Sequence, residues 1–384
     1  MITRPDCVVV GAGIGGLTAA AAVAATGARV LVLEQATTLA PVGAGLTVQP
    51  NAVLALRRLG LATELDDCAC VLDSVTISDA AGRVLSALGP HDADALRSEV
   101  GAPAWGLHRA TLQQHLVAAA RTAGADVTTG TRVSAVDPET ATVTLADGSS
   151  VTGGILIGAD GLHSQVREAV VGQAPVRYSG YSCWRGVTEQ AEFDPGWSGE
   201  FWGAGRRFGG CGIDGDRTYW FAVVSTPPGG QDRDGAKASV ERLVAGFSPQ
   251  VRATVAATPA AAIFRTDISD RAPITTWGRG PTTLLGDAAH AMTPNLGQGA
   301  CQGIEDALVL RDSVATHGAT PEALRAYEAR RRDRANAVVE RAHQLGRIAQ
   351  WRSPAAVAVR NTALRLTPSS VLYRQLRAGW TLPY

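Results

Sequence analysis

The amino-acid sequence predicts an α/β fold that carries an inserted antiparallel sheet and ends in helices. Two short apolar segments, at 7–10 and 29–34, indicate buried strands, and a run of helix-forming residues at 17–25 lies between them. Strand, helix and strand in this order make a βαβ unit, whose two strands run parallel. Between 173 and 272 the helical periodicity is lost and aromatic and turn residues recur, which is typical of antiparallel strands.

The remaining segments divide the chain into three parts. Further helices are expected at 53–59, 109–123, 236–247, 299–316 and 321–346, and further strands at 126–129, 133–136, 141–145 and 155–157. We therefore expect a discontinuous α/β domain formed by 1–72, 102–172 and 273–350, an inserted domain formed by 73–101 and 173–272, and a C-terminal helical segment at 351–384.

Composition narrows the class of protein. Of the 384 residues, 46% are hydrophobic and 18% charged, which favours a large buried core over disorder. The formal net charge is zero, so neither a nucleic acid nor a membrane surface is an expected partner. The excess of arginine over 325–377 is expected to lie on solvated helix faces. Six cysteines without a C-x-x-C pair indicate a reducing compartment, and we expect a cytoplasmic monomer or homodimer.

The first motif that carries chemistry is a G-x-G-x-x-G pattern at Gly11, Gly13 and Gly16, with Gly15 inside it. It follows an expected strand and opens an expected helix. In this setting the glycines allow a tight turn and a close approach of the backbone to a pyrophosphate, which the helix N-terminus stabilises. The pattern therefore predicts a dinucleotide site.

Glu34 strengthens this prediction. It ends the second expected strand, 18 residues after Gly16, where a carboxylate accepts a hydrogen bond from an adenosine ribose. A carboxylate there also disfavours a 2′-phosphate in the same site. Gln35, the next residue, is assigned to this site as well.

A second motif lies about 270 residues later and indicates which dinucleotide is bound. The apolar run at 284–285 leads into Gly286 and Asp287, and a glycine-rich loop that includes Gly297, Gly299 and Ala300 opens another helix. Exposed amides at a helix N-terminus suit the pyrimidine oxygens of a flavin, where negative charge collects on reduction. Asp287 suits the hydroxyls of the ribityl chain. The expected cofactor is FAD.

A third motif, G-A-D-G at 158–161, also follows a buried strand. Asp160 can fix the following turn by accepting from backbone amides, and Arg167 can reach a phosphate or Asp160 itself. When it is considered alone, this motif is better explained as an ordinary aspartate turn.

The three motifs together resemble the class A flavoprotein aromatic hydroxylases, the family typified by p-hydroxybenzoate hydroxylase, over essentially the whole chain. The segment 178–186 is most similar to the branch that holds salicylate and 3-hydroxybenzoate hydroxylases, FAD urate hydroxylases and zeaxanthin epoxidases. The resemblance implies a Rossmann-like FAD-binding domain with an inserted substrate domain. It assigns roles in FAD binding to Gly15, Glu34, Arg109, Val133 and Asp287. It places Asp160 and Arg167 where FAD and nicotinamide binding are linked.

The resemblance also implies an activity. NADH or NADPH would reduce FAD, and O₂ would form a flavin C4a-hydroperoxide that hydroxylates or epoxidises a small aromatic or heteroaromatic substrate. A second G-x-G-x-x-G is absent from the sequence, so a separate nicotinamide domain is not expected. Two alternatives stay open: a flavin reductase or dehydrogenase of the same fold that does not activate O₂, and a non-catalytic flavin-bound partner protein.

The candidate substrate residues lie mostly in the inserted sheet. Arg207 and Tyr219 resemble the arginine and tyrosine positions of the urate hydroxylase branch, although ordinary sheet residues are an equally good interpretation. Trp184, Phe221 and Pro294 are candidate apolar walls of the pocket. No metal site is expected, since the histidines show no H-E-x-x-H pattern, and His290 is interpreted as a structural turn residue.

Overall fold

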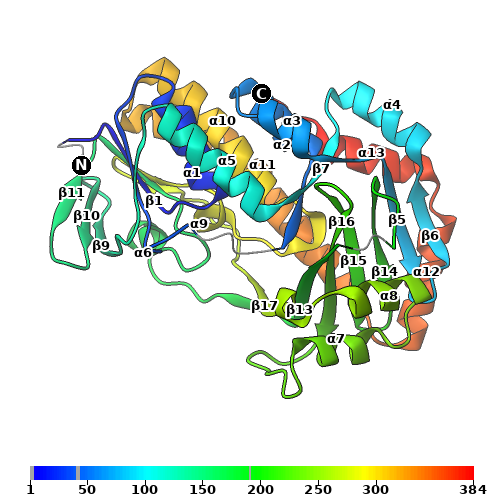
Figure 1. The fold of residues 1–384 in the computed structure, drawn as a ribbon. Helices are drawn as coiled ribbons and strands as arrows, with labels where there is room; N and C mark the ends of the chain where they lie inside the picture. The colour runs from blue at the N-terminus through cyan, green and yellow to red at the C-terminus, as the bar shows by residue number, and fades with distance from the viewer. Residues whose placement is uncertain (1–3, 40–43, 190–191) are drawn as a thin grey trace.

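The computed structural model describes residues 4–39, 44–189 and 192–384 (Figure 1). One part of the molecule is a six-stranded sheet with the order β18-β19-β12-β1-β2-β8, parallel except for the β18–β19 pair. Its strands are β1 (Cys7–Val10), β2 (Val30–Leu33), β8 (Asp126–Thr128), β12 (Ile155–Gly158), β18 (Gly278–Arg279) and β19 (Thr282–Leu284). Every residue of β1, β2 and β12 is buried, which explains their continuous apolar sequences. The predicted α/β class is confirmed.

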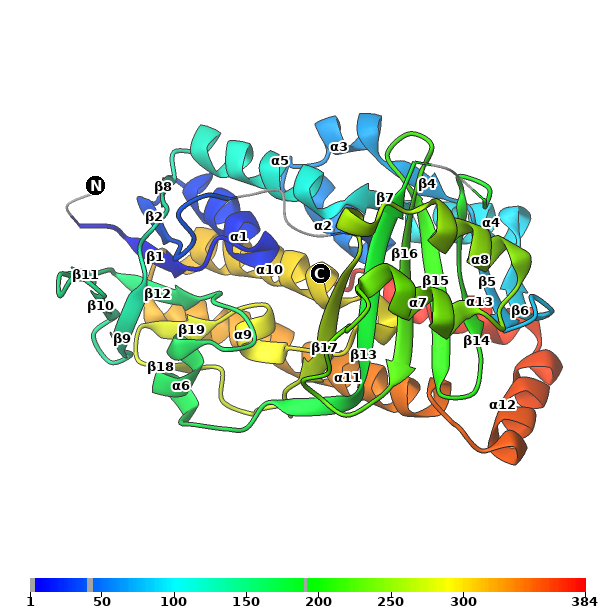
Figure 2. The same ribbon diagram turned by 60° about the horizontal axis from the view of Figure 1, so that its bottom comes forward.

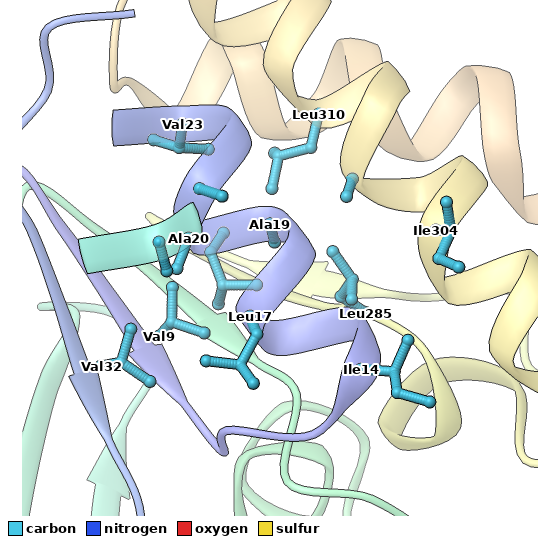
Figure 3. Packing of buried hydrophobic residues seen from close by; sticks show 14 of the residues in the cluster. Val9, Ile14, Leu17, Ala19, Ala20, Val23, Val32, Leu285, Ile304 and Leu310 are labelled. Atoms are coloured by element: carbon cyan, nitrogen blue, oxygen red, sulfur yellow. The ribbon is translucent and has the colours of Figure 1, made fainter. Parts of the chain in front are cut away.

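Helix α1 (Ile14–Ala24) packs between this sheet and helix α10 (Gly299–His317). Figure 3 shows Leu17 of α1 near Val9 and Val32 of the sheet, with Ile304 of α10 on the other side. The two helices can approach closely because glycines meet where they cross: a Cβ atom on Gly303 would lie only 3.4 Å from Gly15 Cα. As a result, the N-terminal ends of both helices lie close together.

The other part of the molecule is a seven-stranded sheet with the order β17-β13-β16-β15-β14-β5-β6. Its strands are β5 (Ser74–Asp79), β6 (Val84–Leu88), β13 (Arg177–Thr188), β14 (Trp197–Trp202), β15 (Arg206–Ile213), β16 (Arg217–Ser225) and β17 (Phe264–Asp270). The strands are antiparallel, as predicted, except for β14 and β5, which pair in parallel.

Two helices cover one face of this sheet (Figure 2), where the sequence predicted a single helix over 236–247. Helix α7 (Ala236–Val244) ends early, and helix α8 (Pro249–Ala257) begins after Ser248, whose hydroxyl accepts from the Val251 amide at 3.5 Å. Proline at the first helical position favours this new start. The apolar side chains of both helices form a separate core with the sheet.

The remaining elements connect and cover the two sheets. A small sheet of β3 (Gly45–Val48), β7 (Ala104–His108) and β4 (Cys70–Leu72) lies between them, and β9 (Val133–Asp137), β10 (Thr142–Leu145) and β11 (Ser150–Thr152) form another. The other helices are α2 (Pro50–Arg58), α3 (Thr63–Cys68), α4 (Pro90–Val100), α5 (Arg109–Thr122), α6 (Gln165–Val171), α9 (Asp287–His290), α11 (Pro321–Ala349), α12 (Pro354–Leu366) and α13 (Ser369–Trp380), with short 3-10 helices η1 (Ala260–Ala262) and η2 (Pro294–Leu296). Within the described ranges, no helix combines the length and the apolar character that crossing a bilayer requires.

Candidate cofactor and substrate site

The turn between β1 and α1 shows why each of its glycines is needed. Gly11 has a φ of +105°, and a side chain there would collide with the carbonyl oxygen of Ala159. A Cβ atom on Gly16 would collide with the carbonyl oxygen of Gly11. At Gly13, by contrast, a Cβ atom would have no neighbour within 4 Å. Gly11 and Gly16 thus form the turn, while the backbone at Gly13 faces open space at the N-terminus of α1, as a pyrophosphate site requires.

Glu34 lies beside this turn and is held in place by the backbone. Its carboxylate accepts from the amides of Ala12 and Ala36, both at 2.8 Å. A hollow of about 450 Å³ lies next to it, lined by Thr37–Leu39 and by residues of α5. Two carboxylate oxygens offer more acceptor sites than these two amides use, so the ribose of an adenosine can still bind.

Asp287 begins α9 directly after Gly286, whose φ of +61° turns the chain out of β19. The carboxyl is open to the site but enclosed by protein on its other side. This burial raises the pKa of Asp287, although His290 and Arg109 act in the opposite direction. The charge of Arg109, the exposed first residue of α5, therefore acts on Asp287, another residue to which the family resemblance assigned a role in FAD binding.

The glycine-rich loop that precedes α10 contributes to the same site. Gly297 has a φ of +62°, and Gly299 opens α10 with no atom close to the position of a Cβ atom. Between them, the Gln298 side chain exchanges two hydrogen bonds with Asn51 of α2, at 3.0 and 3.2 Å. Ala300 follows within the first turn of the helix. The loop therefore presents bare backbone next to the glycine turn of α1.

The third motif is built differently from what its sequence predicts. Asp160 accepts from the amides of Gln165 and Val166, at 2.8 and 3.2 Å, so it fixes the turn as expected. Arg167 does not bond to Asp160. Its buried guanidinium donates to the carbonyl oxygens of Ala288 and Ala289, both at 2.9 Å. Of the two contacts expected for Arg167, the one with Asp160 is therefore wrong, because the guanidinium attaches helix α6 to helix α9; contact with a phosphate stays a prediction.

Two further predicted cofactor residues lie on the adenosine side of the site. Gln35 is exposed immediately after Glu34, and Val133 is the buried first residue of β9. His290 lies inside the core, with Nε2 at 2.6 Å from Asp306 Oδ2, in agreement with a structural role. Among the residues that the structure describes, no cluster of side chains suits a metal ion.

A cavity of about 430 Å³ extends from the glycine-rich loop into the inserted domain. Pro294 and Phe221 line it, as predicted. Trp184 does not, which corrects its assignment: its side chain packs on the opposite face of the sheet, and its indole donates to Asp232 at 2.9 Å. Phe221 and Trp184 are separated in this way because successive side chains of a strand point to opposite faces.

Arg207 and Tyr219 lie next to the cavity rather than in its lining. The Arg207 guanidinium is buried and donates to Glu200 at 3.0 Å, Asn295 at 2.7 Å and Gln350 at 3.2 Å. Glu200 and Asn295 do line the cavity. Arg207 thereby connects the inserted sheet to η2 of the cofactor loop and to the end of α11.

Tyr219 is packed against the small sheet between the two large ones, since a Cβ atom on Gly45 of β3 would collide with its side chain. Burial raises the pKa of the Tyr219 hydroxyl, and its hydrogen bond with Arg185 acts in the opposite direction. Contact of Arg207 and Tyr219 with a substrate stays a prediction.

Replacing Asp287 with alanine is expected to weaken FAD binding by about 10- to 150-fold, the equivalent of about 1.5–3 kcal/mol for a hydrogen bond to a charged group. Titration of the apoprotein with FAD, followed by flavin fluorescence, measures this change. Asp333→Ala removes a carboxylate that is 84% exposed on α11 and serves as the matched control. Equal affinities of the two variants would show that Asp287 has no role in binding.

A glycine turn, a carboxylate held beside it and a second glycine-rich loop together form the arrangement expected of a protein that binds FAD. Residues 4–342 match the family model described as FAD binding domain. The chain belongs to this family, that of the class A flavin monooxygenases.

The similarity to individual relatives extends over nearly the whole chain. It is 39% identical to the aurachin C monooxygenase/isomerase of Stigmatella aurantiaca, with 96% of each sequence covered. It is 32% identical to the 2-heptyl-3-hydroxy-4(1H)-quinolone synthase of Pseudomonas aeruginosa, with 94% of each covered. Among solved structures, it is similar to Klebsiella pneumoniae HpxO complexed with FAD and uric acid, with a TM-score of 0.88, 31% identity, and 97% and 95% of the two chains covered.

Proposed function

We propose that this protein is an FAD-dependent monooxygenase that uses NADH or NADPH and O₂ to insert one oxygen atom into a small aromatic or heteroaromatic substrate, by hydroxylation or epoxidation. One observation carries the proposal. The segment Pro294–Gly297 belongs to the glycine-rich loop of the cofactor site and also lines the 430 Å³ cavity. A molecule in the cavity would therefore lie against the same loop as the cofactor.

When bound, FAD supplies the redox and oxygen-transfer chemistry. The chain's own residues bind and orient the substrate and exclude water. Phe221 and Pro294 provide apolar contact for a flat ring at the inner end of the cavity. Asn295 is fixed by Arg207, Tyr181, Thr293 and Ala342, so it presents a preorganised polar group to the same end.

The relatives support a heteroaromatic substrate. The Pseudomonas relative is named for a quinolone, and the Klebsiella structure holds uric acid. Both are fused ring systems that contain nitrogen. A cavity of about 430 Å³ falls within the range of about 300–1,000 Å³ that is usual for small-molecule sites.

The holoenzyme is expected to consume NADH or NADPH and O₂ in a one-to-one ratio, and to do so at least about tenfold faster once a substrate occupies the cavity. The rate of O₂ consumption is measured with an oxygen electrode, and the rate of nicotinamide oxidation by absorbance, over a panel of phenols and fused nitrogen heterocycles. Mass spectrometry of the product should show an increase of one oxygen atom.

Other outcomes would assign the protein to a different class. Nicotinamide oxidation that needs an added electron acceptor and leaves O₂ untouched would indicate a reductase or dehydrogenase. Bound FAD that neither nicotinamide reduces would indicate a flavin-bound partner protein without activity.

A further inference from the structure

Helix α13 lies against β6, α4 and α2, and one of its sides is apolar. Leu372, Leu376 and Trp380 are spaced four residues apart, so they lie on one side of the helix, and all three line the cavity. No residue of α13 is buried. A helix that belongs to a core normally buries such a face. Here the apolar face borders a hollow.

Polar contacts hold α13 in this position. Tyr373 donates to Glu99 of α4 at 2.9 Å, and Arg377 forms an ion pair with the same carboxylate at 2.7 Å. Because these contacts fix the helix without using its apolar face, Leu372, Leu376 and Trp380 remain available to a ligand.

The opposite wall of the hollow is apolar as well. Val75 and Ile77 are two residues apart on β5 and so lie on the same face of the sheet, next to Leu88 of β6 and Ala93 of α4. Val75 and Ile77 are only partly buried, although β5 is an interior strand of the sheet, with β14 on one side and β6 on the other.

The charged groups in the lining are each in an ion pair or exposed. Asp94 and Arg97 pair with each other at 2.9 Å on the exposed side of α4. Glu200 is bound by Arg207 at the inner end, and Asp73 is an exposed residue before β5. The outer half of the cavity is therefore mostly hydrocarbon, with Ser86, Thr367 and Gln375 as neutral polar groups among its lining residues.

The size of the cavity exceeds what one ring needs. An apolar cavity of about 150 Å³ is enough to bind benzene. The cavity here, at about 430 Å³, is nearly three times as large and is continuous from Pro294 beside the cofactor loop to Trp380 of α13. A ring at the inner end would leave the outer half free.

The geometry points to a substrate with two parts: a flat ring beside Pro294 and Phe221, and an alkyl chain of several carbon atoms that extends between β5, β6, α4 and α13. This inference rests on the proposed function, since it treats the cavity as the substrate site. It adds the chemical class of the substrate, a lipophilic ring compound with a hydrocarbon tail.

The test measures binding rather than turnover. Two series of probes, 2-alkyl-4(1H)-quinolones and 4-alkylphenols with methyl, butyl and heptyl chains, are titrated into the oxidised holoenzyme without nicotinamide. The Kd is obtained from the change in the flavin absorbance spectrum. Each added methylene is expected to lower the Kd by roughly threefold to fourfold, so that heptyl binds at least about a hundredfold tighter than methyl in one or both series. A Kd that is independent of chain length in both series, or no binding by either heptyl probe, would overturn the inference.

Substitutions in α13 test whether the alkyl tail of the probe lies against this helix. In Leu372→Ser/Leu376→Ser, the gain in affinity per methylene should fall to less than half, and folding should be retained because no residue of α13 is buried. The matched control is Leu366→Ser on α12, whose side chain is 77% exposed and outside the cavity lining; it should keep the parent's dependence on chain length. Equal chain-length dependence in the double variant and the control would place the tail elsewhere and refute the assignment to α13.

The two proposals fail in distinguishable ways. If long-chain probes bind tightly but no probe stimulates O₂ consumption, the tail site stands and the monooxygenase function is wrong. If methyl probes are oxygenated and chain length has no effect on Kd, the function stands and the tail site is wrong.

Discussion

Replacing Arg331 with leucine is expected to lower the free energy of unfolding by about 3–5 kcal/mol, because it leaves two buried carboxylates without their main counter-ion. Arg331 is fully buried in α11. Its Nη1 lies 2.5 Å from Glu305 and its Nε lies 2.6 Å from Asp306, and both carboxylates are also buried. Urea-induced unfolding of the apoprotein measures the change.

The same substitution should weaken FAD binding, because the two carboxylates support the cofactor loops. Asp306 accepts from the amide of Gly286 at 3.0 Å, directly before Asp287. Glu305 accepts from Asn51 at 2.6 Å, and Asn51 is paired with Gln298 of the glycine-rich loop. Loss of Arg331 therefore disturbs both loops at once, and lower flavin content after purification should accompany lower stability.

The neighbouring arginine supplies the control. Arg332 pairs with Asp333 on the surface of the same helix, and such exposed pairs contribute about 0–1 kcal/mol. Arg332→Leu should therefore leave the free energy of unfolding within about 1 kcal/mol of the parent. Equal destabilisation by the two substitutions would contradict the importance of the buried network.

The pH dependence of stability follows from the same carboxylate. Burial by itself would raise the pKa of Asp306, but His290 and Arg331 outweigh it and lower this pKa to about 2. A carboxyl whose pKa is lower in the folded protein stabilises the fold above its unfolded pKa, near 4, and loses this contribution as the pH falls toward 2.

Much of the cofactor site could be predicted because its signals are local. Gly11, Gly13 and Gly16 act through a turn of six residues, and Glu34 acts at the end of the adjacent strand. Spacing along the chain therefore fixes their positions in space. Gly286 and Asp287 are far from the first glycine turn in the sequence, yet they too follow a buried parallel strand, β19, and such strands end at the same edge of a sheet.

The buried network could not be predicted, because its members are far apart in sequence and resemble surface residues. The arginines of 325–377 were expected on solvated faces, and Arg332 and Arg365 are indeed at the surface. Arg331 and Arg360 are buried instead. Only the tertiary position of the carboxylates on α10 decides which arginine of α11 turns inward.

The substrate cavity shows a second limit. The inserted sheet was predicted from its aromatic residues, but the direction in which each side chain points depends on strand register. Trp184 and Phe221 lie on neighbouring strands and point to opposite faces. The contribution of α13 to the cavity could not be predicted either, because this helix begins 148 residues after Phe221 and no local pattern indicates that the two lie close together.

Replacing Gly13 with alanine is expected to weaken FAD binding roughly 100-fold while the apoprotein stays folded. Gly13 has ordinary extended angles, φ −73° and ψ 177°, and a Cβ atom there meets no other atom within 4 Å. The added methyl group would instead occupy the space that a pyrophosphate needs, and each lost hydrogen bond to that charged group is worth about 1.5–3 kcal/mol. FAD titration measures the affinity, and urea unfolding of the apoprotein should change by less than about 1 kcal/mol.

The Gly16→Ala variant is the contrasting case, because we expect it to lower the stability of the apoprotein itself. A Cβ atom at Gly16 would collide with the carbonyl oxygen of Gly11, which belongs to the backbone and cannot rotate away. Overpacking of this kind costs about 1–3 kcal/mol, so this variant should be destabilised even without FAD. The contrast tests the assignment of the two glycines, since one limits the approach of a ligand and the other the packing of α1 on β1. If the Gly13→Ala variant binds FAD as tightly as the parent, the pyrophosphate does not lie at this helix N-terminus. The orientation of the flavin toward the cavity would then be refuted as well.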